Sequence, residues 1–230
     1  MSMKLEQVVP WGRSLDEYAH MFDLGESELA TSRILGVGDG PASFNVEMHA
    51  LGRRVVSVDP IYVFAPEQIR ARVEATHDQL VKAASDHHDL FTWRHLRSPQ
   101  HMGEVRVAAM ERFLEDFERG KADGRYIAAA LPSLPFADRS FDLALCSHLL
   151  FLYSDQLSYE LHLAGIIEMA RVAREVRIFP LLGLGNVPSP HLPRIRDELP
   201  RRGYVCELRK VPYEFQKGGD EMMVVRANSL

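Results

Sequence analysis

The segment from residue 33 to residue 59 constrains the fold of this chain most strongly. An apolar run over residues 33–37 leads into a turn with glycines at positions 36, 38 and 40, a helical stretch follows, and a second apolar run over residues 54–58 ends at Asp59. Glycines at alternate positions allow a sharp turn and the close approach of a ligand, because they carry no Cβ. A carboxylate at the end of the next strand can accept hydrogen bonds from both hydroxyls of a ribose. The segment therefore predicts one half of a nucleoside-binding site.

The order of the other elements predicts an α/β fold. The first two apolar runs are almost free of polar residues, which suits parallel strands covered on both faces. We expect a doubly wound, mostly parallel seven-stranded sheet with helices on both faces, in which the last two strands can pair antiparallel. The expected strands are residues 33–37, 54–58, 126–130, 141–147, 175–182, 204–208 and 221–226. The expected helices are residues 14–24, 41–51, 66–85, 100–119, 156–173 and 196–201.

The segment between the second and third strands is longer than a crossover requires. One helix is enough to connect two parallel strands, but residues 60–124 contain two helical stretches and a connector rich in histidine and aromatic residues. We predict a single domain over residues 1–230 with a helical cap inserted over residues 60–124, near the strand ends and above the ligand cleft. In the connector, His87, His88 and Asp89 are adjacent and point in different directions, so they predict a solvated or substrate-facing segment rather than a metal site.

The composition is that of an ordinary globular protein and disfavours two classes of partner. The chain has 27 Lys and Arg residues against 32 Asp and Glu residues, a net charge of −5, whereas strong nucleic-acid binding usually accompanies a basic balance. The longest apolar run, residues 143–153, is too short to span a bilayer. Cys146 and Cys206 lie in apolar runs, as buried free thiols do in a reducing compartment. We therefore expect a cytoplasmic protein that binds neither nucleic acid nor membranes; the sequence does not indicate its oligomeric state.

Two further runs resemble a known superfamily. Residues 134–142, Leu-Pro-Phe-Ala-Asp-Arg-Ser-Phe-Asp, resemble a run that many class I S-adenosylmethionine-dependent methyltransferases carry between the third and fourth strands. Residues 168–173, Glu-Met-Ala-Arg-Val-Ala, resemble the helix before the fifth strand of the same families. The matches extend from about residue 33 to residue 182 and leave out the cap. The resemblance implies a Rossmann-like fold that binds S-adenosyl-L-methionine and transfers its methyl group.

The resemblance also implies a place for each part of that cofactor. The glycine turn would lie beneath the methionine and ribose, Asp59 would bind the ribose hydroxyls, and Pro60 and Ile61 would flank the adenine. Backbone amides near Leu131 would replace an acidic contact to the adenine, because Ala130 stands at that position. The implied cofactor-binding residues are Gly36, Val37, Gly38, Gly40, Asp59, Pro60, Ile61, Leu131 and Ser147.

Candidate acceptor-site residues come from two segments. In the resembling families, the segment after the fourth strand lines the cavity between cofactor and acceptor, and here it contains His148, a candidate general base with a side chain that titrates near neutral pH. A histidine packed at a strand end is the equally weighted alternative. The candidate contacts to a small-molecule substrate are Tyr62, Trp93, His95 and Tyr153, with core packing as the alternative for the aromatic residues. The Asn/Asp-Pro-Pro-Tyr signature of enzymes that methylate amino groups of nucleic acids is absent.

Three functions are compatible with these patterns. The first is methyl transfer from S-adenosylmethionine to a small-molecule acceptor. The second is a catalytically silent regulatory protein that binds S-adenosylmethionine or another nucleoside, because Ile34 and Ala130 stand where many family members have acidic residues. The third is an NAD(P)-dependent oxidoreductase, whose G-x-G-x-x-G pattern requires a glycine where this chain has Pro41.

Overall fold

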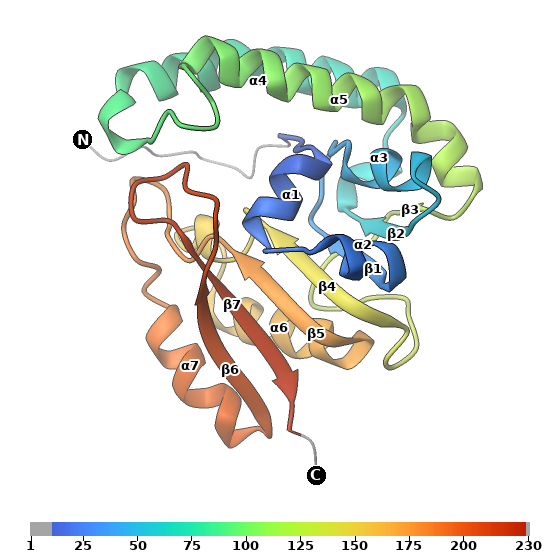
Figure 1. Ribbon diagram of the computed structural model, residues 1–230, viewed down its shortest axis with the longest axis vertical. Coiled ribbons are helices and arrows are strands. Elements are labelled where there is room, and N and C mark those ends of the chain that lie inside the picture. The colour runs from blue at the N-terminus through green and yellow to red at the C-terminus, as the bar shows by residue number, and fades with distance from the viewer. Residues whose placement is uncertain (1–10, 229–230) are drawn as a thin grey trace.

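The fold is built on one seven-stranded sheet, seen in a computed structural model that describes residues 11–228 (Figure 1). The strand order is β3-β2-β1-β4-β5-β7-β6. Strands β1 to β5 pair in parallel, whereas β7 pairs antiparallel with both β5 and β6. The sheet is therefore mixed, and the predicted α/β architecture is confirmed. The strands are β1 (Arg33–Val37), β2 (Arg54–Val58), β3 (Tyr126–Ile127), β4 (Phe141–Ser147), β5 (Ala173–Phe179), β6 (Tyr204–Lys210) and β7 (Glu221–Ala227).

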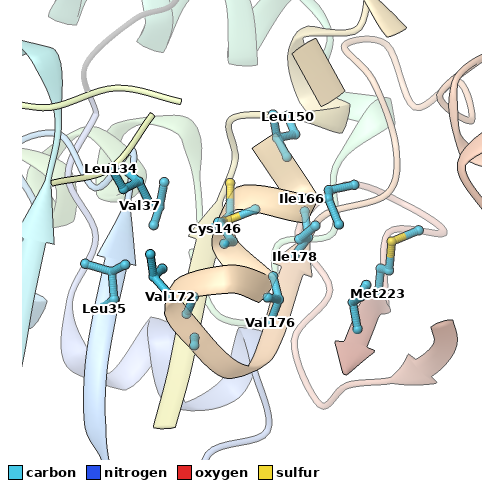
Figure 2. Packing of buried hydrophobic residues seen from close by; sticks show 14 of the residues in the cluster. Leu35, Val37, Leu134, Cys146, Leu150, Ile166, Val172, Val176, Ile178 and Met223 are labelled. Atoms are coloured by element: carbon cyan, nitrogen blue, oxygen red, sulfur yellow. The ribbon is translucent and has the colours of Figure 1, made fainter. Parts of the chain in front are cut away.

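Helices cover both faces of this sheet, because alternate side chains of each inner strand enter two different cores. Leu35 and Val37 of β1 belong to the same core as Ile166 of α6 (Tyr159–Val172), on the face that also carries α7 (Leu192–Arg201); Figure 2 shows part of this core. Ile34 lies on the opposite face, in the core that includes residues of three short helices. These helices are α1 (Leu15–Met21), α2 (Glu26–Thr31) and α3 (Phe44–Ala50).

The structure corrects the bounds of several predicted elements. The helix predicted over residues 14–24 ends at Met21, because Asp23 adopts a positive φ of 49° and turns the chain into α2. The helix predicted from residue 41 begins at Phe44, after the glycine turn. The third strand has two residues instead of five, since the chain turns back at a bridge between Ala130 and Ser133. Strand β5 ends at Phe179, not at residue 182.

The segment between β2 and β3 forms two long helices, α4 (Pro66–Asp86) and α5 (Pro99–Ala122), with short 3-10 turns at Pro60–Val63 and His88–Leu90. The two helices pack together and lie across the ends toward which β4 and β5 point (Figure 1). At one end, aromatic residues of α5 pack with Tyr62 and Tyr126. At the other end, Phe91 stacks on Phe215 of the β6–β7 loop, with ring centroids 4.6 Å apart. The helical pair is thus attached to both edges of the sheet.

No helix among residues 11–228 is both long enough and apolar enough to cross a membrane.

Candidate functional site

The glycine turn after β1 serves two different purposes. Gly38 and Gly40 have positive φ angles of 70° and 55°, a backbone conformation that side chains with a Cβ rarely adopt. A Cβ on Gly36 would lie 1.8 Å from the Asp39 carboxylate, which folds back over this position. Gly36 therefore makes room for Asp39, while Gly38 and Gly40 shape the surface that a ligand can reach.

Asp59 lies at the carboxyl end of β2, opposite this turn. Its two oxygens accept hydrogen bonds from the backbone N–H groups of Gly40 (2.8 Å) and Ile61 (2.9 Å). The side chain is buried, and burial raises the pKa of Asp59 to about 6. A carboxylate has about four acceptor positions, so two remain available to donors from a ligand.

Asp39 is a second buried carboxylate in the turn, and the sequence analysis missed it. It accepts hydrogen bonds from the hydroxyls of Tyr18 (2.7 Å) and Ser57 (2.6 Å). Burial, together with the nearby charge of Asp59, raises the pKa of Asp39 to about 7. The sequence does contain a signal for it: Asp39 is an acidic residue between two glycines of the turn. The backbone of such a turn places this side chain against the strand ends.

A cavity of about 350 Å³ opens above the turn, near the lower end of the size range of small-molecule sites. It brings together most of the predicted cofactor-binding residues, whereas Gly36 does not line it. The predicted residues that line it are Val37, Gly38, Gly40, Asp59, Pro60, Ile61, Leu131, Ser147 and His148. Ala130, which the sequence analysis placed beside the adenine, also lines it, as do Leu149 and Leu150 of the segment after the fourth strand. The residues that sequence reasoning missed are Trp11, Arg13, Tyr18, Asp39, Ala129, Leu157 and Leu161.

His148 follows β4 directly and has a positive φ of 51°. Its backbone N–H donates to the Phe179 carbonyl at 2.6 Å, which fixes this unusual conformation. Its Nδ1 lies 2.9 Å from the Ser147 hydroxyl. Burial and the positive charges of Arg13 and Arg106 lower the pKa of His148 well below its ordinary value, so the ring is neutral at pH 7.

The four predicted substrate contacts lie in three different places. Tyr62 is buried beneath the turn, where its hydroxyl donates to the Gly40 carbonyl at 2.7 Å. Tyr153 lines a second, smaller cavity that adjoins the first. Trp93 packs against Phe215 of the β6–β7 loop.

His95, the fourth contact, stacks on Tyr213 with ring centroids 5.3 Å apart. Neither Trp93 nor His95 lines either of these two cavities. Within residues 11–228, no three or more His, Cys, Asp or Glu side chains are grouped so that they could hold a metal ion.

One sequence relative covers nearly the whole chain. The uncharacterized protein MJ0045 of Methanocaldococcus jannaschii is 32% identical over 225 residues, which are 97% of this chain and 98% of that protein. No protein-family model matches the chain.

Solved structures with a similar fold include several methyltransferases. Magnesium protoporphyrin IX methyltransferase of Synechocystis PCC 6803, with bound SAM, is 13% identical with a TM-score of 0.47, over 94% of this chain and 78% of that one. A putative S-adenosyl-L-methionine-dependent methyltransferase of Methanococcus maripaludis is 11% identical with a TM-score of 0.47, over 94% and 84%. The 1,6-didemethyltoxoflavin-N1-methyltransferase of Burkholderia thailandensis, with bound 1,6-didemethyltoxoflavin and S-adenosylhomocysteine, is 12% identical with a TM-score of 0.43, over 87% and 72%. The sheet itself, mostly parallel and seven-stranded with helices on both faces, agrees with the Rossmann-like fold that the resemblance in the sequence implies.

Proposed function

This chain belongs to the same protein family as MJ0045 of Methanocaldococcus jannaschii, and we propose that it transfers a methyl group from S-adenosylmethionine to a small-molecule acceptor. The observation that carries the proposal is the buried Asp59 carboxylate, held across a positive-φ glycine turn at the edge of a 350 Å³ cavity. A site of this kind accepts the two hydroxyls of a ribose. Two segments that resemble class I methyltransferases, residues 134–142 and residues 168–173, support the same activity.

The residues of the cavity fit the parts of S-adenosylmethionine. Asp59 has unused acceptor positions for the ribose hydroxyls. The neighbouring Ile61, Ala129 and Leu131 give an apolar surface for the adenine, and Ala130 offers no acidic contact there. Asp39 lies in the turn beside β1 and is a carboxylate suited to the α-ammonium group. It would replace the acidic residue that is absent at Ile34.

His148 is proposed to accept the proton that an acceptor loses. Its pKa is well below the neutral value expected from the sequence, so it is a weak base and suits a proton that the methylation step itself makes acidic. Bound S-adenosylmethionine supplies an electrophilic methyl group on a sulfonium, so the protein has mainly to align the acceptor and remove a proton. The Ser147 hydroxyl lies 3.9 Å from Met21 Sδ and can donate to it. In the tautomer in which His148 Nδ1–H donates to the Ser147 oxygen, Nε2 carries the lone pair and can accept a proton.

The helices α4 and α5 are proposed to act as a cap within a single domain, inserted over residues 60–124. They lie across the carboxyl ends of the strands (Figure 1), where ligands of open α/β sheets bind. Tyr62 connects this cap to the glycine turn through its hydrogen bond to Gly40. A cap in this position would exclude water from the reacting groups.

Isothermal titration with S-adenosylhomocysteine tests cofactor binding. Asp59→Ala should weaken binding by about 1.5–3 kcal/mol, since it removes a charged hydrogen-bond acceptor. Asp155→Ala, a control at an exposed carboxylate, should leave the affinity unchanged. No binding to the wild-type protein would contradict the proposal.

Catalysis needs a separate measurement, because a regulatory protein could bind the cofactor without turnover. That alternative is favoured by Ala130, which stands where many methyltransferases have an acidic residue. Acceptor-dependent formation of S-adenosylhomocysteine on a panel of small metabolites would support the transferase. Binding without turnover on every acceptor would support the regulatory alternative.

A further inference from the structure

A second cavity adjoins the first, and three residues line both. It measures about 90 Å³. The shared residues are Trp11, Arg13 and His148, so the two cavities meet where the candidate base lies. Beyond this junction, the second cavity is largely apolar and aromatic, with Phe91, Met102 and Phe215 in its wall, and Tyr153 and Gln216 add polar groups.

The guanidinium of Arg13 brings an unbalanced positive charge to the junction. Within residues 11–228, no carboxylate lies within ion-pairing distance of it, and its NH1 donates only to the Trp11 carbonyl, at 3.1 Å. The nearby Glu17 is already engaged, since it pairs with Arg106 and accepts from the Tyr213 hydroxyl at 3.0 Å. Burial and the charge of Arg106 lower the pKa of Arg13 to about 10, which leaves it protonated at neutral pH. Two guanidinium groups thus lie near one carboxylate, and only Arg106 pairs with it.

Buried polar atoms around the junction also lack partners. Arg13 Nε and Trp11 Nε1 are buried N–H donors, and Gln216 Oε1 is a buried acceptor; none of the three has a hydrogen-bond partner among the described residues. Gln216 is itself fixed, because its amide nitrogen donates to the Gly183 carbonyl (3.0 Å) and to Asn186 Oδ1 (3.1 Å). Buried polar groups in folded proteins are almost always paired, so these atoms indicate a ligand with acceptors at one end and a donor at the other.

We propose that the second cavity holds the methyl acceptor and that this acceptor is a small organic acid with an apolar or aromatic body. Its carboxylate binds Arg13 and Trp11, its body lies against Phe91, Met102 and Phe215, and a hydroxyl or amino group donates to Gln216. This inference rests on the proposed function for its assignment as acceptor site. A guanidinium suits a carboxylate because its planar array of N–H donors matches the two oxygens.

The cofactor carboxylate is the competing partner for Arg13, since Arg13 also borders the first cavity. The unpartnered Gln216 oxygen favours the acceptor, because Gln216 lines only the second cavity and is out of reach of a ligand confined to the first. Comparing S-adenosylhomocysteine with 5′-methylthioadenosine, which lacks the amino-acid portion, separates the two possibilities.

The test uses matched acid and amide probes on the full chain. Protein saturated with S-adenosylhomocysteine, and protein without it, are titrated with benzoate and benzamide and with 4-hydroxybenzoate and 4-hydroxybenzamide. Each acid should bind more tightly than its amide, and 4-hydroxybenzoate more tightly than benzoate, because its hydroxyl lies opposite the carboxylate and can donate to Gln216. Arg13→Gln should weaken binding of the acids about ten-fold or more, whereas Arg97→Gln, the same substitution at an exposed arginine, should not.

Three results would overturn the inference. One is that no acid binds more tightly than its amide, which requires only the wild-type protein and so does not depend on whether Arg13→Gln folds. Another is that Arg13→Gln leaves binding of the acids unchanged. The third is that Arg13→Gln weakens S-adenosylhomocysteine but not 5′-methylthioadenosine, which assigns Arg13 to the cofactor. Failure of the wild-type protein to bind S-adenosylhomocysteine would instead contradict the proposed function.

Discussion

Single residues of the glycine turn differ in what they contribute, although the sequence shows three similar glycines. Gly36 provides space for the Asp39 side chain, so its effect on a ligand is indirect. Gly38 lines the cavity and needs its left-handed conformation. The carboxylates of Asp39 and Asp59 are both buried and both have a raised pKa, which makes the turn sensitive to pH.

Gly38→Ala should abolish most cofactor binding while the protein still folds. The new Cβ would meet Leu149 at 2.5 Å and force this side chain to move within the cavity wall. Gly124→Ala is the matched control, because Gly124 has nearly the same φ, 72°, but open space around the position of a Cβ. Both variants should lose about 1–2 kcal/mol of unfolding free energy from the left-handed backbone, and only Gly38→Ala should lose binding in a titration with S-adenosylhomocysteine. Equal binding by the two variants would mean that the turn is purely structural.

The stability of the protein should depend on the ionisation of Asp39. Its pKa is about 7 when folded, against an ordinary value of 3.8, so between these values the folded state holds a proton that the unfolded state has released. The contribution of Asp39 to the free energy of unfolding therefore falls as the pH rises from about 4 to about 7. The Asp39→Asn variant lacks this pH-dependent contribution. In urea unfolding, its free energy of unfolding relative to that of the wild-type protein should therefore rise from about pH 4 to about pH 7.

Asp142→Asn is the control for this pH dependence. Hydrogen bonds from Arg33 lower the pKa of Asp142, so this carboxylate stays ionised in both states above about pH 5. Its difference from the wild-type protein should be constant between pH 5.5 and pH 8. A constant difference for Asp39→Asn over the same range would show that its carboxyl titrates normally.

At the scale of elements, the contact between the cap connector and the β6–β7 loop determines where the cap lies. The backbone N–H of Thr92 donates to the Phe215 carbonyl at 2.7 Å, and that of Lys217 donates to the Leu90 carbonyl at 3.0 Å. Phe91 is buried in this contact. Phe91→Ala should cost about 3–5 kcal/mol of unfolding free energy, as buried aromatic truncations do, and should speed trypsin cleavage after Arg94 and Arg97.

Phe64→Ala makes the same substitution where the ring is 48% exposed, and should have little effect on either measurement. If Phe91→Ala resists trypsin as well as the wild-type protein does, the connector is held by its backbone contacts alone.

Elements with a strong local pattern could be predicted from the sequence, and contacts between distant segments could not. The strands β1, β2 and β4 were predicted with little error because each is an apolar run bounded by turns. The site residues that belong to these strand ends, such as Asp59 and Ser147, were predicted with them. Trp11 and Arg13 were missed because nothing local marks an irregular segment that folds over the cavity. Trp93 and His95 were placed at the cleft because the sequence cannot show that the connector packs on residues 211–220 instead.

At the scale of the whole molecule, one buried ion pair joins three parts of the chain. Arg106 of α5 pairs with Glu17 of α1, and Tyr213 of the β6–β7 loop donates to the same carboxylate. Arg106 and Glu17 are 1% and 5% exposed, so removing one partner leaves a charge in a poorly solvated site. The cap, the N-terminal segment and the C-terminal hairpin are therefore expected to unfold together.

Arg106→Met should cost about 3–5 kcal/mol of unfolding free energy, because it leaves the Glu17 carboxylate buried without its partner. The double variant Glu17→Gln/Arg106→Met should recover part of this loss, since the charge is removed and Tyr213 keeps an acceptor. Arg70→Met is the control within the same cap: its ion pair with Glu111 is 43% exposed on both sides, and its loss should cost about 0–1 kcal/mol.

Urea unfolding followed by tryptophan fluorescence reports on the cap end, where Trp11 and Trp93 lie, and circular dichroism reports on the whole chain. The two transitions should coincide in the wild-type protein. A separate fluorescence transition would show that the cap unfolds as an independent unit. Equal losses of unfolding free energy in Arg106→Met and Arg70→Met would show that the buried ion pair does not hold the cap.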